Sequence, residues 1–469
     1  VGGLLLLDPS GAPEGTLTLD GLREVLEPRL HLAPMLRQRL VTVPLGLARP
    51  YWVDDPDFDI EFHLREIALP QPGDDAHLSE QIGRIHARPL DRARPLWEMY
   101  LIHGVQGGRQ ALYSKVHHAA IDGVSGAEIL AVIVDTTVEP RIEEPPEEYW
   151  DPAPLPSPVE LFQRGVEAAV KQPAETLRTL PRALPYIAEL PFVSLLPGAK
   201  TAGQIAGSLA SMAVGGGSEG QVVNRRTLVA PSTPINARIT AHRRFAFGSV
   251  DLEDVKSVKN GFALTVNDVV MTLCAGALRR WLLDHDGLPE EPLVVAVPVS
   301  IRTADHQGDG NQVSMMLAEL PTHLEGPAQR LAAVQASMTA AKEQFQALPT
   351  TILQDVTTVI PTLWASLAAR AVFRVVSAGA PSFNLFVSNV PGPQMPLYVG
   401  GARILGIYPA SAITDLTGAL SITVFSYDGS LDIGLIACRE LVPDVWRLVD
   451  YLREALDELL ELVASDVGD

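Results

Sequence analysis

Two adjacent histidines followed by an aspartate and a glycine offer the clearest chemistry in this sequence. They lie in the run Lys115-Val116-His117-His118-Ala119-Ala120-Ile121-Asp122-Gly123, where an apolar strand-like segment meets a turn. An imidazole titrates near neutral pH, so a positioned histidine can take a proton from an alcohol or a thiol. Side chains alternate between the two faces of a strand, so His117 and His118 are expected to point in opposite directions. One of them is therefore expected to face a reaction centre and the other to support it.

The same run is a poor metal site, because no third histidine, cysteine or carboxylate stands at ligand spacing nearby. The chain has only two cysteines, Cys274 and Cys438, which excludes a disulfide framework and disfavours structural zinc. Cys274 lies on an apolar helical face with no basic residue beside it, so we expect a buried thiol rather than a nucleophile. No metal is expected.

The composition describes an acidic and apolar protein. Its 469 residues include 36 Lys and Arg against 56 Asp and Glu, a formal charge of −20, and 47% are hydrophobic. This charge disfavours nucleic-acid binding, so any anionic substrate has to be bound by a local group of arginines. No apolar run reaches the roughly 20 residues that cross a bilayer, so we expect a soluble or peripheral protein. The chain starts at Val1 without an initiator Met, and we expect a native N-terminal segment upstream.

Alternating strand and helix patterns predict an α/β protein in two halves. The halves are predicted at residues 1–138 and 237–469, separated by a proline- and glycine-rich crossover with short helices at residues 139–236. Asp428-Gly429 predicts a tight hairpin, and an amphipathic helix is predicted over Pro443–Val463. The predicted strands are Val1–Leu7, Phe62–Leu69, Met99–Val105, Gln110–His117, Leu293–Ile301, Gln312–Leu320, Phe383–Val390, Leu420–Tyr427 and Leu431–Cys438.

Six sequence motifs together resemble those of one enzyme family. The run His117-His118-x-x-x-Asp122-Gly123 is similar to the HHxxxDG motif of the CoA-dependent acyltransferase superfamily, which includes peptide-synthetase condensation domains and chloramphenicol acetyltransferase-like enzymes. In their order, the motifs resemble those of the bacterial wax ester synthase/diacylglycerol acyltransferase family over essentially the whole sequence. The other five are Pro95-Leu96-Trp97-Glu98, Asn267-Asp268-Val269-Val270, Pro298-Val299-Ser300-Ile301-Arg302, Gly310-Asn311-Gln312-Val313-Ser314 and Ser388-Asn389-Val390-Pro391-Gly392-Pro393.

The resemblance implies two chloramphenicol-acetyltransferase-like α/β domains, each with a mixed sheet, and an active-site tunnel at their interface. It implies that His118 is the general base, which deprotonates an acceptor hydroxyl that attacks the acyl-CoA thioester directly. His117 is expected to support His118, and Gly123 to form the turn of the motif. Asp122 is expected to be structural, with Arg302 as its partner, because an unpaired arginine just past an apolar strand would be costly.

The other motifs have both structural and functional interpretations. Asn267 and Asp268 resemble part of a capping box and are expected to be architectural, holding a helix against the tunnel. Ser388 and Asn389 precede a rigid Pro-Gly-Pro turn and are candidates for lining the tunnel or for stabilising an oxyanion. Pro95, Leu96 and Trp97 are further candidates for substrate binding, and packing in the core is an equal alternative for them. Arg243 and Arg244 are candidates for binding CoA phosphates, together with Arg225 and Arg226. The alternative for these arginines is an ordinary solvated face.

The predicted function is transfer of a long-chain acyl group from acyl-CoA, a substrate, to diacylglycerol or a fatty alcohol, without a cofactor. The apolar segment Thr362–Ala380 is interpreted as a buried helix or as an interfacial one. The second interpretation predicts a cytoplasmic enzyme at the inner membrane or at lipid droplets. Two alternatives are amide-forming condensation on the same fold and a catalytically silent lipid-binding or droplet-coating protein. Acceptor preference and acyl chain length do not follow from the sequence.

Overall fold

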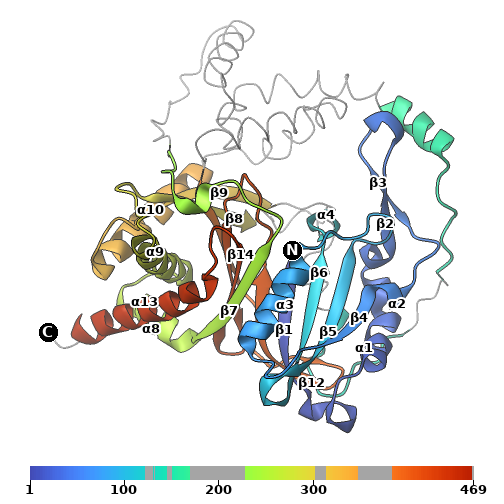
Figure 1. Cartoon of the computed structure of the whole chain (residues 1–469), viewed down its shortest axis with the longest axis horizontal. Helices are drawn as coiled ribbons and strands as arrows, with labels where there is room; N and C mark the ends of the chain where they lie inside the picture. Colours follow the sequence, from blue (N-terminus) through green and yellow to red (C-terminus); the bar gives the residue numbers. More distant parts are fainter. Residues whose placement is uncertain are drawn as a thin grey trace, which may run out of the picture.

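The computed structural model describes residues 1–121, 130, 132–144, 150–168, 228–300, 313–346 and 383–466. Within these ranges the main elements are two large sheets with helices packed on them (Figure 1). The strands are β1 (Gly2–Asp8), β2 (Gln38–Val41), β3 (Tyr51–Asp54), β4 (Leu64–Ala68), β5 (Trp97–Val105), β6 (Arg109–Val116), β7 (Arg243–Asp251), β8 (Leu293–Ser300), β9 (Val313–Leu320), β10 (Leu385–Val390), β11 (Tyr398–Val399), β12 (Ala402–Ala410), β13 (Leu420–Tyr427) and β14 (Ser430–Cys438). The α-helices are α1 (Leu19–Leu26), α2 (Ile60–His63), α3 (Asp75–Ala87), α4 (His118–Ile121), α8 (Leu252–Gly261), α9 (Val266–Asp284), α10 (Pro327–Gln346) and α13 (Val445–Asp466).

The described strands form two six-stranded mixed sheets, one in each lobe of the molecule. The strand order is β11-β12-β1-β6-β5-β4 in the N-terminal lobe and β7-β14-β13-β10-β8-β9 in the C-terminal lobe. In the first sheet only β4 and β5 are parallel, and in the second β10 is parallel to both β13 and β8. The predicted α/β class and mixed sheets are therefore confirmed. β2 and β3 form a separate two-stranded sheet.

Strand β6 lies inside the N-terminal sheet, antiparallel to β1 and to β5. Its side chains alternate as a strand requires: Leu112 and Val116 belong to one apolar core, and Tyr113 belongs to the other. The second core continues into the C-terminal lobe, and α3 contributes to it from its position beside β7. Because β6 is buried on both faces, it is a rigid support for His117 and His118, which follow its C-terminal end.

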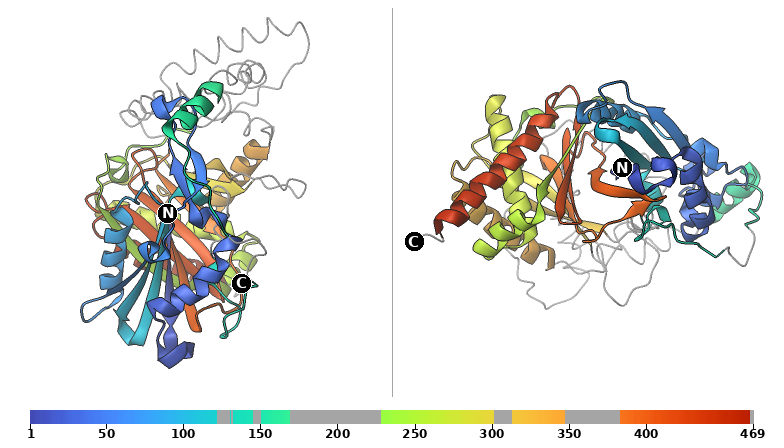
Figure 2. Two further views of the ribbon diagram at one scale, coloured as in Figure 1. Left: turned by 90° about the vertical axis from the view of Figure 1, so that its right-hand side faces the viewer. Right: turned by 90° about the horizontal axis from the view of Figure 1, so that it is seen from below.

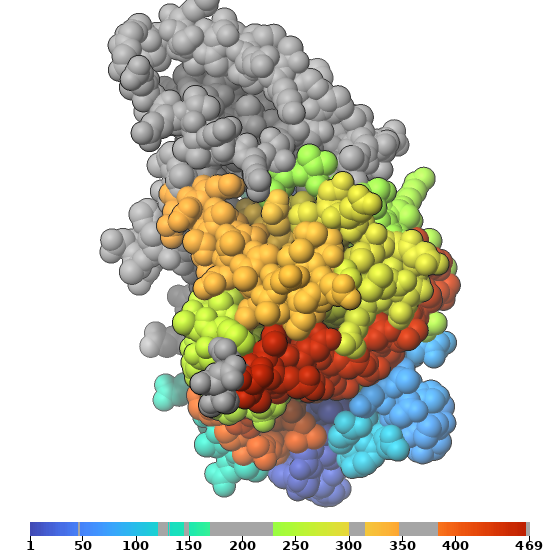
Figure 3. All heavy atoms as spheres, turned by 90° about the vertical axis from the view of Figure 1, so that its left-hand side faces the viewer, coloured from blue at the N-terminus to red at the C-terminus, as the bar shows by residue number. Residues whose placement is uncertain are grey.

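The C-terminal sheet is covered on its outer side by helices α9, α10 and α13, which form a closed layer in the space-filling view (Figure 3). Helix α9 begins with a capping box: Thr265 Oγ1 accepts from the Asp268 amide at 3.2 Å, and Asp268 accepts from the Thr265 amide at 2.9 Å. The capping role predicted for Asp268 is confirmed. The predicted hairpin is also present, since Asp428 and Gly429 connect β13 to β14 with φ angles of 42° and 83°.

Strands β11 and β12 come late in the chain but belong to the N-terminal sheet. β12 pairs antiparallel with β1 along its length, from Gly2 opposite Ala410 to Asp8 opposite Arg403. The same strand contacts β13 and β14 of the C-terminal lobe, so it links the two sheets, as the view from below shows (Figure 2). The buried Asp432 of β14 reinforces this link by accepting from the Ile407 amide at 2.7 Å. Strand β12 therefore belongs to the N-terminal sheet and packs against the C-terminal sheet.

All nine predicted strands are present, and their ends in the described residues differ from the predicted ends by at most two residues. The strand predicted from Phe62 begins at Leu64, because the preceding residues form the short helix α2. The predicted C-terminal helix is α13, and it continues to Asp466. Among the described residues no single helix is long and apolar enough to cross a membrane; α8 and α9 meet the length and composition criteria only as a pair, bent by 102°.

Candidate active site

The two histidines lie where β6 ends and α4 begins. The His117 amide donates to the Leu96 carbonyl oxygen at 2.9 Å, just beyond the paired residues Trp97 of β5 and Val116 of β6. The His117 carbonyl then accepts from the Ala120 amide at 2.9 Å, and Nδ1 of His117 accepts from the Ala119 amide at 3.2 Å. The chain thus leaves the strand at His117 and forms a helical turn from His118. Strand alternation applies only as far as Val116, so it does not by itself place the two imidazoles on opposite faces.

Both histidine side chains are exposed, whereas the strand that carries them is buried. An exposed imidazole on a buried, hydrogen-bonded backbone can meet a substrate without losing its position, which is the arrangement a general base needs. The segment Pro95–Trp97 is buried and contacts His117 through the Leu96 carbonyl oxygen. The Trp97 indole donates to the Leu36 carbonyl at 2.7 Å, and its ring stacks on His63 with a centroid distance of 4.3 Å. The structure places these three residues in the core, where Leu96 supports His117.

A buried polar network lies beside the histidine end of β6. Nδ1 of His86 on α3 lies 2.6 Å from the Tyr113 hydroxyl, and the Lys115 ammonium donates to the carbonyl oxygens of Ile85 and Arg88 at the end of α3. Lys115 thereby places a positive charge at the C-terminal end of a helix, where the macrodipole favours it. Sequence reasoning missed this network, although Tyr113 and Lys115 precede His117 at the two-residue spacing of one strand face. The network holds α3 against β6 two residues before the catalytic candidates.

Burial is the main cause that lowers the pKa of His86 to about 3, and the nearby positive charges of Lys115 and Arg243 contribute to this shift. The unfolded chain takes up this proton near pH 6.5, so the neutral folded form loses stability as the pH falls from there towards 3. At about 1.4 kcal/mol for each pH unit, this group alone is expected to lower the free energy of unfolding by about 2 kcal/mol between pH 7.5 and pH 5. Urea titrations of the wild type and His86→Gln at both pH values measure this; an equal loss in both proteins would contradict it.

Arg243 and Arg244, at the start of β7, lie in different surroundings. Adjacent residues of a strand point to opposite faces. Arg243 donates to the carbonyl oxygens of Thr240 and His242. Arg244 lines a hollow of about 220 Å³ between α3 and the start of α13, with its Nε buried and lacking a hydrogen-bond partner. The two guanidinium groups therefore do not form one basic cluster, and Arg225 and Arg226 lie outside the described residues.

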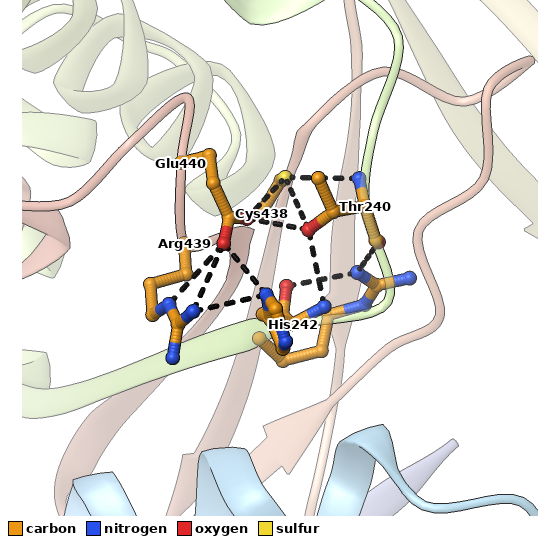
Figure 4. Close-up of polar contacts among 6 residues, drawn as sticks. Thr240, His242, Cys438, Arg439 and Glu440 are labelled. Carbon is orange, nitrogen blue, oxygen red and sulfur yellow. Dashed lines mark hydrogen bonds and ion pairs between the residues drawn. The ribbon is translucent and has the colours of Figure 1, made fainter.

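Arg243 instead belongs, through its hydrogen bonds to the carbonyl oxygens of Thr240 and His242, to a polar cluster with Arg439 and Glu440 at the end of β14, which we call the Glu440 cluster. Figure 4 shows Thr240, His242, Arg439 and Glu440 of this cluster. The Glu440 carboxylate lies 2.7 Å from Nδ1 of His242 and 3.1 Å from Arg439, and it accepts from the Thr240 hydroxyl. The hydrogen bond from Thr240 is the main cause that lowers the pKa of Glu440 to about 2. The Glu440 carboxylate thus contacts Arg439 and His242, and Arg243 adds a second arginine to the cluster through the carbonyl oxygens of Thr240 and His242.

Ser388 and Asn389 are half-buried at the end of β10. Ser388 lies opposite Thr423 of β13, and the Thr423 hydroxyl lies 2.7 Å from the hydroxyl of Ser411. Ser411 follows Ala410, which pairs with Gly2, and Gly2 pairs in turn with Lys115. The sheet registers therefore bring the Ser388 row of the C-terminal sheet towards the end of β6 that carries the histidines.

Several predicted site residues lie outside the described residues: Asp122, Gly123, Arg302, the segment 310–312 and the Thr362–Ala380 helix. The expected pairing of Asp122 with Arg302 therefore stays a prediction, as does the tunnel. Asn267 lies in the first turn of α9 beside the capping box. Within the described ranges, no three His, Cys, Asp or Glu side chains are grouped as metal ligands. The Cys274 thiol is buried, which raises its pKa to about 12 and makes it a poor nucleophile.

The two-lobed arrangement of mixed sheets is the fold of condensation domains. A condensation domain of the calcium-dependent antibiotic synthetase has the same fold, with a TM-score of 0.50 at 18% identity over 99% of this chain and 90% of its own. The wax ester synthase/diacylglycerol acyltransferase of Marinobacter aquaeolei is more similar, with a TM-score of 0.66 at 30% identity, covering 99% of this chain and 94% of that one.

The chain belongs to the wax ester synthase/diacylglycerol acyltransferase family. The model of the family's catalytic domain matches residues 1–270, and that of the WS/DGAT C-terminal domain matches residues 309–460. A putative diacylglycerol O-acyltransferase of Mycobacterium tuberculosis is 36% identical over 98% of this chain and 86% of its own length. The O-acyltransferase WSD of Acinetobacter baylyi is 32% identical over 99% and 93%. The protein is therefore an O-acyltransferase, with an acyl donor and an acceptor as substrates.

Proposed function

We propose that this enzyme transfers a long-chain acyl group from acyl-CoA to the hydroxyl of diacylglycerol or of a fatty alcohol. The observation that carries the proposal is the histidine pair at the β6–α4 junction, inside the segment that matches the family's catalytic domain. The apolar composition of the chain suits long acyl substrates. The proposed substrates are those named by the family and by its relatives, and CoA is the carrier that the HHxxxDG resemblance implies.

In the proposed reaction His118 acts as general base. Its imidazole takes the proton of the acceptor hydroxyl while the hydroxyl oxygen attacks the thioester carbonyl carbon. The carbon–sulfur bond then breaks, the CoA thiolate leaves and takes the proton from the imidazolium, and the ester remains as product. No acyl-enzyme forms, so the nucleophile is the acceptor itself. His117 supports the turn through its backbone contacts with Leu96 and Ala120.

The basic groups of the Glu440 cluster have a role in the same proposal. A CoA phosphate needs positive charge, and a protein with a net charge of −20 offers it only locally. Arg243, Arg439 and His242 of the Glu440 cluster are the proposed contacts. Ser388 and Asn389 are proposed to line the acyl or acceptor path, and the enzyme is proposed to work in the cytoplasm, at the inner membrane or at lipid droplets.

A panel of acceptors tests this function. With one long-chain acyl-CoA, kcat/KM is measured for diacylglycerol, a long-chain alcohol and monoacylglycerol, and for an amine acceptor as the condensation alternative. We expect ester formation with at least one of the first two and no amide. Transfer only from an acyl group on a carrier protein would support the condensation alternative. Binding of acyl-CoA without turnover of any acceptor would support the silent lipid-binding alternative.

A further inference from the structure

The connection from α3 to β5, residues 88–96, is rich in arginine. It contains Arg88, Arg92 and Arg94 but one acidic residue, Asp91, in a chain whose net charge is −20. We call this connection the arginine loop. Arg88 and Arg92 are exposed and Arg94 is half-buried. None of the three guanidinium groups has an ion-pair or hydrogen-bond partner among the residues that the structure describes.

The carboxylates around the arginine loop are used elsewhere. Asp91 accepts from the backbone amide two residues later at 2.9 Å, and it offsets one of the three positive charges at most. Glu98, near the start of β5, lies 3.8 Å from Arg65, and Glu80 on α3 lies 2.7 Å from Arg84. The loop therefore keeps a net positive charge. Because like charges on one loop repel each other, that charge favours the binding of an anion.

The Phe62 ring holds one of these guanidinium groups in place. The terminal carbon of the Arg94 guanidinium lies 4.1 Å from the Phe62 ring centroid. Asp59, which caps the same short helix as Phe62, accepts from the Glu61 amide at 2.9 Å and is not paired with Arg94. Stacking on an aromatic face leaves the N–H groups at the edge of a guanidinium free. Arginine binds phosphate with these groups, often through two parallel hydrogen bonds.

Both ends of the arginine loop are fixed to the strand that leads to the histidines. At one end the Arg88 carbonyl accepts from the ammonium of Lys115, two residues before His117. At the other end the Leu96 carbonyl accepts from the His117 amide at 2.9 Å. The loop therefore lies beside the histidine junction without containing it, which suits the binding of a part of the substrate that does not itself react.

We propose that the arginine loop binds a phosphate group of the acyl-CoA donor. The inference rests on the proposed function, because CoA carries its thioester at one end of the pantetheine arm and its phosphates at the other. CoA has a diphosphate and a separate 3′-phosphate, so it has one anionic group for the loop and another for the Glu440 cluster. That cluster adjoins the same helix: a Cβ at Gly83 of α3 would lie 2.9 Å from the Arg243 carbonyl oxygen. The cluster contains a carboxylate that contacts Arg439, whereas the loop arginines have no such partner.

Acyl donors with and without phosphates test the arginine loop. With the full chain, kcat/KM is measured for a long-chain acyl-CoA and for the same acyl group on pantetheine, which has the thioester but no phosphate. The loop variant is Arg88→Gln/Arg92→Gln. The control is Arg164→Gln/Arg447→Gln, which changes the net charge equally at side chains that are also exposed.

We expect the loop variant to lose at least about tenfold in kcat/KM on acyl-CoA, mainly through KM, since each lost contact is a hydrogen bond to a charged group. On acyl-pantetheine it should match the wild type, and the control should match the wild type on both donors. An equal loss on both donors would show a structural role and overturn the proposal, as would an unchanged kcat/KM on acyl-CoA.

Direct binding measurements separate this inference from the proposed function and from attraction to lipid head groups, which also carry phosphate. Calorimetric titration compares free CoA with pantetheine, and flotation measures binding to phosphatidylglycerol vesicles. We expect the wild type to bind CoA more tightly than pantetheine and the loop variant to lose most of that difference.

A wild type that binds CoA no better than pantetheine would overturn the inference. So would a loop variant that binds CoA like the wild type but no longer binds the vesicles, since the arginines would then contact head groups. A wild type that binds CoA through the loop but acylates no acceptor would refute the proposed function and leave this inference standing.

Discussion

Replacement of His118 by alanine is expected to lower kcat/KM for ester formation by at least about 100-fold, the usual contribution of a general base. The side chain stands at the first residue of α4, after a backbone that Leu96 and Ala120 hold in place. Because the imidazole is exposed, its loss opens no cavity in the core. The thermal midpoint should therefore stay close to that of the wild type, so the activity loss is attributable to the missing base.

His117→Ala is the matched control for this measurement. It removes an exposed imidazole of the same size from the adjacent position, together with the contact from the Ala119 amide. We expect a smaller loss of kcat/KM than for His118→Ala. The assignment of the base would fail if His118→Ala kept more than a few per cent of wild-type activity, or if His117→Ala were the more damaging change.

Replacement of Arg29 by methionine is expected to lower the free energy of unfolding by about 3 kcal/mol or more, as in other buried ion pairs that lose one partner. The Arg29 guanidinium lies 2.9 and 3.0 Å from the two carboxylate oxygens of Asp135, and both side chains are only 2% exposed. Arg29 also donates to the carbonyl oxygens of Val132 and Arg141. The change would leave a buried carboxylate with fewer donors, and urea titration measures the cost.

Two further variants give this prediction its controls. Arg84→Met removes an exposed pair with Glu80 on α3 and should cost less than about 1 kcal/mol. Arg29→Met/Asp135→Leu removes both buried charges and should recover part of the stability lost in the single variant. If Arg29→Met lowered the free energy of unfolding no more than Arg84→Met, the prediction that the buried Arg29–Asp135 pair stabilises the fold would be wrong.

Local patterns predicted those parts of the fold that depend on neighbours in sequence. The β13–β14 hairpin follows from Asp428-Gly429, and the start of α9 follows from the spacing of Thr265 and Asp268. Strand β12 was not predicted. It contains Gly406 and Pro409, which are poor strand formers, and it is stabilised by β1 at the other end of the chain. A pairing across so long a separation leaves no local pattern from which to infer it.

As with the fold, the parts of the site that depend on local sequence could be predicted. The motif identified the strand end that carries His117 and His118. The hydrogen bond from the His117 amide to Leu96 links this motif to the Pro95-Leu96-Trp97-Glu98 motif. The contribution of His86 was not predictable, because its helix, β6 and Ser411 meet only in the folded chain. The pairing of Arg243 with Arg244 could not be judged from the sequence: alternation along β7 separates the two side chains, and Arg439 joins the cluster of Arg243 from the end of β14. A role of these arginines in binding CoA stays a prediction.

The position of β12 also constrains how the chain can be made. The ribosome synthesises β1 and β6 early, but the edge of β1 that pairs with β12 stays unpaired until the chain has been synthesised beyond residue 402. During that interval the nascent N-terminal lobe exposes unpaired backbone groups, which are a template for aggregation. The lobe therefore completes its fold only near the end of translation. Truncated chains released before β12 therefore carry the histidine motif without the finished sheet around it.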